Sequence, residues 1–230
     1  MRIVVRAMKK CNVCQELHSA TIEGCDPRYQ ALVDSRQNII HESPDFVVLP
    51  SLGPLNDSHV MIVPKAHINN FSVIPDAKLV QVRMIAQALS SYVELRHGKS
   101  LVFFESGAGV RSNHSGGCIV HAHIHCVYEH EEFERRLFQE IDFQESGLSW
   151  YNGADGDLGY VWYKSGKGKA VLCNNPQLPS QFLRYVYSMS AGDIRFWNWR
   201  RHNNIEGVLK VVECYKGFQK YIETSQSIPE

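Results

Sequence analysis

One eleven-residue stretch constrains this chain more than any other. Gly117 to Val127, GCIVHAHIHCV, places histidine at every second position of an apolar run. Alternation with a period of two is typical of a β-strand, in which residues i, i+2 and i+4 lie on one face. The pattern therefore predicts that His121, His123 and His125 project together. Burying histidine costs free energy unless its ring nitrogens have partners, so three on one face predict metal ligands, hydrogen-bonded pairs or a catalytic role.

The rest of the chain predicts strands first, then a helix, then further strands. The strand-like apolar segments before the histidine stretch are 38–41, 45–50, 59–64 and 101–104. A helix is predicted between Asp76, a good N-cap, and Gly98, a good terminator. Its apolar residues at helical spacing are Leu79, Val82, Ile85, Ala86, Leu89, Tyr92 and Val93. This order is typical of an α+β fold, an antiparallel sheet meander with helices packed on it.

A shift in composition divides the chain near residue 145. Residues 130–143 predict a helix, whereas 146–157 are rich in Gly, Asn, Asp and Ser, as is typical of a boundary. Beyond it a hairpin is predicted at 160–163 and 170–173, and helices at 180–189 and 206–221. We therefore expect a domain over 1–145 that carries the site, and a C-terminal α+β extension over 146–230 that packs on the same domain.

Composition and charge argue against two classes of partner. The 24 Lys and Arg balance the 24 Asp and Glu, so the chain lacks the basic surplus of a general nucleic-acid binder. No apolar run approaches the roughly 18 residues of a membrane span, and the apolar run at the start of the chain is too short for a signal-peptide core. Seven cysteines without such a signal favour free thiols in a reducing compartment. We expect a cytoplasmic protein that binds neither DNA, RNA nor membranes.

Cys11 and Cys14 form a CxxC motif, which has three interpretations. It serves redox sites, but those normally lie in a thioredoxin-type unit, and none is apparent here. It also serves tetrahedral zinc, which needs two more Cys or His ligands. The candidates for these are His59, His67 and the histidines of the 117–127 stretch. From the residues alone, a pair of buried free thiols remains equally open.

Together these motifs resemble the histidine-triad (HIT) family over about residues 8–135. HAHIHCV fits the His-φ-His-φ-His-φ-φ pattern, where φ is apolar, and HVMIVPKAH from His59 to His67 is similar to the family's earlier strand and its Pro-Lys-x-His. In the zinc-bearing branch, metal comes from the CxxC, the Pro-Lys-x-His histidine and the first triad histidine. The matching residues here are Cys11, Cys14, His67 and His121. The resemblance thus implies a structural Zn²⁺, because four protein ligands leave no open position for water.

The resemblance also implies an activity and an assembly. The middle histidine, His123, would attack the α-phosphorus of a phosphate-linked nucleotide conjugate and form a covalent nucleotidyl intermediate, which water or another acceptor removes. A backbone carbonyl would hold its other nitrogen and fix the tautomer. His125 would contact phosphate oxygens. Nucleoside phosphoramidates and dinucleotides are suitable substrates, hydrolysis and transfer both remain open, and a homodimer is expected.

The loop before the triad departs from the family pattern. Gly117 and Cys118 stand where many members carry Gln followed by Ser or Thr, so a hydroxyl donor is lost. Glycines allow backbone N–H groups to approach a phosphate closely, which offers an alternative. The expected substrate-binding residues are His59, His114, Ser115, Gly116, Gly117 and Cys118. This departure keeps a second hypothesis open, a zinc-stabilised nucleotide-binding or interaction module with little or no turnover.

The C-terminal extension resembles that of a larger bacterial branch of the family. Trp197 and Trp199 alternate beside arginines, so they suit either base stacking or core packing. Arg184 and Arg200 are open candidates for phosphate binding.

Overall fold

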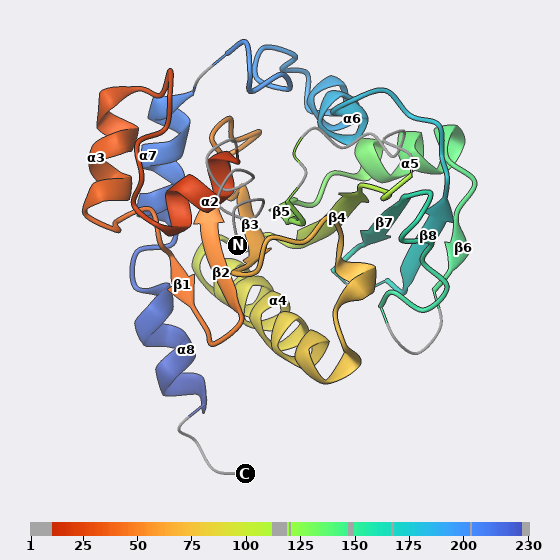
Figure 1. Cartoon of the computed structure of the whole chain (residues 1–230), viewed down its shortest axis with the longest axis horizontal. Helices are drawn as coiled ribbons and strands as arrows, with labels where there is room; N and C mark the ends of the chain where they lie inside the picture. The colour runs from red at the N-terminus through yellow and green to blue at the C-terminus, as the bar shows by residue number, and fades with distance from the viewer. Residues whose placement is uncertain are drawn as a thin grey trace.

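A single antiparallel sheet with helices on both faces organises the computed structural model (Figure 1). The structure describes residues 11–111, 119, 121–146, 150–166, 168–202 and 204–226. The strands are β1 (His41–Glu42), β2 (Phe46–Pro50), β3 (Val60–Pro64), β4 (Leu101–Gly107), β5 (Ile124–Tyr128), β6 (Gln144–Glu145), β7 (Tyr160–Lys164) and β8 (Ala170–Asn174). They lie in the order β1-β2-β3-β5-β4-β7-β8-β6, and each pairing is antiparallel. The predicted α+β class with an antiparallel sheet is confirmed.

Short helices surround the sheet, and one long helix crosses it. The helices are α2 (Asn12–Leu17), α3 (Pro27–Asp34), α4 (Asp76–His97), α5 (Glu131–Glu140), α6 (Phe182–Ser190), α7 (Ile205–Cys214) and α8 (Phe218–Gln226), with a 3₁₀ turn η1 (Phe71–Val73). Within the described ranges no helix, α4 included, combines the length and apolarity needed to cross a lipid bilayer.

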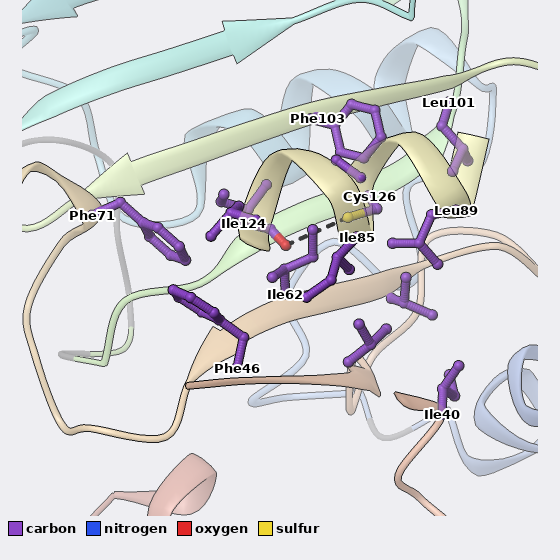
Figure 2. Packing of buried hydrophobic residues seen from close by; sticks show 14 of the residues in the cluster. Ile40, Phe46, Ile62, Phe71, Ile85, Leu89, Leu101, Phe103, Ile124 and Cys126 are labelled. Carbon is purple, nitrogen blue, oxygen red and sulfur yellow. Dashed lines mark hydrogen bonds between the residues drawn. The ribbon is translucent and has the colours of Figure 1, made fainter. Parts of the chain in front are cut away.

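Helix α4 covers one face of the sheet as its periodicity predicts. Its seven predicted apolar residues are all buried, and it ends at Gly98, whose φ of 61° is in the left-handed region. The one difference lies at its start, where Pro75 takes the N-cap position and Asp76 is the first helical residue. Figure 2 shows Ile85 and Leu89 of α4 packed in one cluster with Ile62 and Ile124 of the sheet.

The opposite face of the sheet carries two separate groups of helices. Over β2 and β3, Val13 and Cys14 of α2 pack against residues such as Met61. Over β4, β5 and β7, helices α5 and α6 pack against residues such as Phe104. The register pairs His125 with Met61 on one side and with Phe104 on the other, so His125 lies between the two groups. The candidate site is built at this position.

The histidine stretch joins the sheet later than its alternation predicts. β5 begins at Ile124, so His125 is in a paired strand whereas His121 and His123 precede it. The reason is a contact made before the strand, where Ala122 N–H donates to the Ile68 carbonyl (2.7 Å). This bond turns the approach segment toward the loop after β3. The prediction of a strand through all three histidines is therefore wrong at its start.

The C-terminal residues extend the sheet and then return to its other end. β7 continues the sheet on β4, from the pair Phe103 and Lys164 to the pair Gly107 and Tyr160. After α6 the chain reaches α7, which lies beside α3 (Figure 1), with Val208 packed in a cluster with residues of that helix. The prediction of a single helix over 206–221 is wrong. The segment divides into α7 and α8, because Gly217 adopts a φ of +91° that a helix cannot contain.

Candidate active site and metal centre

The structure brings the four predicted metal ligands together from three separate segments. Cys11 is the N-cap of α2 and Cys14 lies within it. His67 follows β3, and His121 precedes β5. One ligand atom from each of the four lies within 4.8 Å of all the others.

The distances between these atoms fit a tetrahedral metal. Cys14 Sγ lies 3.2 Å from His67 Nδ1 and 3.4 Å from His121 Nδ1, and Cys11 Sγ lies 3.6 Å from His121 Nδ1. Zinc–sulfur bonds of about 2.3 Å and zinc–nitrogen bonds of about 2.0 Å give sulfur–nitrogen edges of roughly 3.5 Å in a tetrahedron. Both the donor set and the geometry therefore suit zinc.

The neighbourhood of the cluster orients its ligands. His121 Nε2 donates to the Pro64 carbonyl (2.9 Å), so the ring presents the lone pair of Nδ1 to the two sulfurs. Burial lowers the pKa of His121 to about 4, which keeps the ring neutral. Burial and the neighbouring Cys11 raise the pKa of Cys14 to about 12, and both cysteines are free thiols. Deprotonating such thiols near neutral pH takes a bound cation.

His123 is held in one tautomer by the backbone of its own segment. Its Nδ1 lies 2.7 Å from the His121 carbonyl oxygen. A carbonyl oxygen can only accept, so Nδ1 carries the proton and Nε2 carries the lone pair. The ring is 7% exposed, and burial lowers the pKa of His123 below its ordinary value. The result is a neutral imidazole with its nucleophilic nitrogen defined.

A chain of two hydrogen bonds fixes the tautomer of His125. The Leu55 backbone N–H donates to His59 Nδ1 (3.0 Å), so the proton of neutral His59 is on Nε2. That Nε2 donates to His125 Nδ1 (2.8 Å), which places the proton of His125 on its own Nε2. Burial lowers the pKa of both rings well below the ordinary value, so both are neutral. His125 is thereby a hydrogen-bond donor at Nε2.

His123 and His125 line a cavity that elements from both halves of the chain enclose. Other residues at its wall are Val13, Glu16, Ser51, Met61, Arg184 and Trp199. The Tyr29 hydroxyl donates to the buried Glu16 carboxyl (2.7 Å), and burial raises the pKa of Glu16 to about 8. A larger cavity of about 420 Å³ shares Asn12, Leu52 and Trp199 with it. The cavity at His123 itself measures only about 20 Å³, so most of the open space in this region belongs to the larger one.

Of the predicted substrate-binding residues, the structure describes only His59. His59 is completely buried and reaches the site through His125. The predicted substrate-binding residues His114, Ser115, Gly116, Gly117 and Cys118 lie outside the described residues.

Sequence reasoning missed Ser51 and left Arg184 an open candidate for phosphate binding. Arg184 is 3% exposed, and its Nη1 donates to Ser51 Oγ (3.3 Å) at the cavity wall. The signal that could have pointed to it is a lone cation within the apolar helical run FLRYVYSM, since such a residue is rarely buried without a purpose.

Comparisons with known proteins return one family and several solved structures. A family described as "Protein similar to CwfJ C-terminal" matches residues 35–143, which include His59, His67 and the triad but neither the CxxC motif nor Arg184. No curated protein matches the sequence at a significant level.

Several of the similar solved structures are described as histidine-triad or HIT-like proteins. A zinc-bound histidine triad family protein from Mycobacterium smegmatis is 13% identical with a TM-score of 0.41, over 54% of this chain and 78% of that one. A Hit-like protein involved in cell-cycle regulation from Bartonella henselae is 16% identical with a TM-score of 0.37, over 45% and 76%. The C. elegans NitFhit protein is 22% identical with a TM-score of 0.37, over 41% of this chain and only 22% of that one.

Proposed function

We propose that this chain is a nucleotidyl hydrolase or transferase in which His123 is the nucleophile. The observation that carries the proposal is the bond from His123 Nδ1 to the His121 carbonyl, which leaves a neutral ring with its lone pair on Nε2. The same ring lines a cavity together with His125 and a buried arginine, Arg184. A neutral nucleophile beside fixed donors is the arrangement that attack on a phosphate ester or phosphoramidate requires.

The reaction proceeds in two displacements. His123 Nε2 forms a bond to the α-phosphorus of a phosphate-linked nucleotide conjugate, and the bond from phosphorus to the leaving group breaks. The leaving group departs with that electron pair and takes a proton from solvent or a nearby acid. Water then attacks phosphorus, the phosphorus–nitrogen bond returns its pair to Nε2, and the proton of water goes to solvent. A hydroxyl or phosphate acceptor in place of water gives transfer instead of hydrolysis.

The other residues of the site position this chemistry. His125 donates from Nε2 to a phosphate oxygen, because its Nδ1 is occupied by His59. Cys11, Cys14, His67 and His121 hold a zinc ion, whose contribution is structural. The resemblance of the HAHIHCV motif to the HIT family supports the same assignment.

Intact-mass spectrometry after brief incubation with nucleoside phosphoramidates and nucleotide sugars tests the proposal. The unmodified chain should gain the mass of one nucleotidyl group. His123→Ala should gain none, because it lacks the attacking nitrogen. His202→Ala is the matched control, since His202 is exposed, and it should behave like the unmodified chain.

Two further outcomes separate the alternatives. Exchange of the adduct into added phosphate or sugar phosphate would assign transfer, whereas release by water alone would assign hydrolysis. Nucleotide binding that survives His123→Ala, with neither adduct nor product from the unmodified chain, would contradict the enzymatic proposal. It would instead favour a zinc-stabilised nucleotide-binding module.

A further inference from the structure

Trp199 lies between two unequal spaces beside the proposed nucleophile. The cavity that His123 and His125 line measures only about 20 Å³, and the neighbouring cavity measures about 420 Å³. Asn12, Leu52 and Trp199 lie at the walls of both. A space of roughly 15 Å³ holds one water molecule, whereas sites for small organic ligands typically measure about 300–1,000 Å³. A nucleotide conjugate therefore cannot reach His123 until the wall between the two cavities moves.

The three shared wall residues differ in how they are held. Asn12 belongs to α2, which also carries Cys14 of the proposed metal cluster, and Leu52 packs in the cluster beneath α3 and α7. Trp199 lies instead in the connection from α6 to α7, where the described residues form neither helix nor strand. This connection crosses from the α6 side of the molecule to the α7 side (Figure 1). We call its residues 193–202 the strap.

The strap lies directly on the backbone of a glycine. A Cβ atom at Gly53 would lie 2.5 Å from Trp199 Cβ and 3.0 Å from Trp199 Cα, so a residue with a side chain would not allow the strap to lie this close. Arg184 holds the strap from the α6 side, since its Nε donates to the Trp197 carbonyl (2.8 Å) and its Nη2 to the Phe196 carbonyl (3.1 Å). Both contacts place Trp199 against the cavity.

We propose that the strap is a lid on the active site, closed in this structure by Trp199, and that its opening joins the two cavities into one site large enough for a nucleotide conjugate. The inference rests on the proposed function and concerns how the substrate reaches His123. In the open state the reacting phosphorus lies at His123, and the rest of the conjugate extends into the larger cavity, whose wall includes Ile22, Tyr29 and Val208. In the closed state the lid keeps other reactants away from His123.

Carbethoxylation measures access to His123 without any nucleotide. Diethyl pyrocarbonate transfers an ethoxycarbonyl group to a neutral imidazole, and tandem mass spectrometry assigns the label to individual histidines. A site that is open in about 0.1–10% of molecules reacts at that fraction of the rate of a permanently open one. Trp199→Ala removes the indole that separates the cavities, so His123 should be labelled at least about 10-fold faster than in the unmodified chain.

Two histidines and one variant serve as controls. His18 is exposed, so it should be labelled at the same rate in every protein. His59 is completely buried and does not line the cavity, so its labelling should stay slow as long as the chain is folded. Phe138→Ala, at an exposed aromatic residue of α5, is the matched variant and should leave the rate at His123 unchanged.

Gly53→Ala disturbs the same contact from the other side. Its new Cβ would overlap Trp199, so this variant should also accelerate labelling of His123, and it decides the result if Trp199→Ala does not fold. An unchanged rate at His123 in a folded variant would overturn the inference. An equal acceleration at His59 would overturn it too, because it would show a loosened fold. Failure of both variants to fold would do the same, since a lid has to leave its position without unfolding the chain.

The two proposals fail in different ways. A chain in which labelling of His123 responds to Trp199, but which never forms a nucleotidyl adduct, contradicts the proposed function and leaves the lid standing. A chain that forms the adduct, while Trp199→Ala and Gly53→Ala leave the labelling of His123 unchanged, contradicts the lid alone.

Discussion

Single backbone groups decide where protons sit on the histidines of this site. The carbonyls of Pro64 and His121 and the N–H of Leu55 each bond to one ring nitrogen. Since the rings are neutral, each such bond settles which of the two nitrogens carries the lone pair. The division of the proposed roles between a metal ligand, a nucleophile and a donor therefore depends on main-chain atoms that mutation cannot easily remove.

Replacing His59 with Phe tests whether these hydrogen bonds determine the histidine tautomers. The change removes the Nε2–H that donates to His125 Nδ1, so His125 should lose its single tautomer and become a mixture. Long-range ¹H–¹⁵N correlation spectra report the tautomers directly. In the unmodified chain they should show the proton on Nε2 of His125 and on Nδ1 of His123, and the latter should persist in His59→Phe. A proton on Nδ1 of His125 in the unmodified chain would contradict the assignment.

Glu105 makes stability depend on pH. Its carboxyl accepts from Phe71 N–H (3.1 Å) and from the Tyr160 hydroxyl (2.8 Å), yet burial dominates and raises its pKa from 4.5 to about 8. The folded state therefore binds this proton more tightly than the unfolded state. The stabilisation is complete below pH 4.5 and is lost as the pH rises toward about 8, at roughly 1.4 kcal/mol per pH unit.

Glu105→Gln should remove this contribution. In urea denaturation, the unfolding free energy of the variant relative to the unmodified chain should increase between pH 4.5 and about 8, because the amide has no proton to lose. Glu94→Gln, at an exposed position of α4, should leave the pH profile unchanged. If the difference in unfolding free energy between Glu105→Gln and the unmodified chain stays constant with pH, the Glu105 carboxyl is already ionised across this range.

Among the elements, we expect α2 to depend most on the proposed metal centre. It has six residues and no side-chain N-cap, which is too short for a helix to persist alone. It also carries two of the four ligands and packs on β2 and β3 through Val13 and Cys14. The position of Val13 at the wall of the His123 cavity thus follows from how α2 is held.

Removal of the metal should destabilise this element first. Elemental analysis should find one zinc per chain, and Cys14→Ser should lose it. Free zinc a thousandfold above its Kd adds about 4 kcal/mol to the free energy of unfolding. Loss of this contribution in Cys14→Ser or after chelation should lower the Tm by about 8–16 °C. Hydrogen exchange should rise most in residues 12–17. Cys173→Ser, in β8 and outside the cluster, should keep both zinc and Tm. Absence of zinc in the purified chain would contradict the metal site.

At the scale of the whole molecule, residues on both sides of the predicted division near 145 share one sheet. β7 pairs with β4 along five residue pairs, and α6 packs beside α5 on the face that holds the site. A chain that ends at residue 145 should therefore expose the edge of β4 and the apolar face beneath α6.

We expect this truncated chain to aggregate or to lack a cooperative transition. Circular dichroism during thermal denaturation and size-exclusion chromatography measure both properties against the full chain. A soluble truncated chain with a cooperative transition would show instead that the first 145 residues form an independent domain.

Local patterns account for the parts of this structure that the sequence could predict. Helix α4 could be predicted because its helical periodicity lies in one contiguous segment. The metal ligands could be predicted because the CxxC and Pro-Lys-x-His motifs are each contiguous as well. The start of β5 could not be predicted, because it depends on a bond between Ala122 and the distant Ile68. The lone cation in an apolar helical run could have marked Arg184 as buried, but its partners are carbonyls of two loops, so no local pattern predicts where it lies.

His121 links the proposed metal centre to the proposed nucleophile, since only Ala122 separates it from His123. Its Nδ1 faces the two cysteines, while its carbonyl oxygen accepts the hydrogen bond from His123 Nδ1 that fixes the tautomer of His123. A shift of His121 is therefore transmitted over a few covalent bonds to the atom that sets the reactivity of its neighbour. The reactivity proposed for His123 should therefore fall when the proposed metal is removed and return when it is restored.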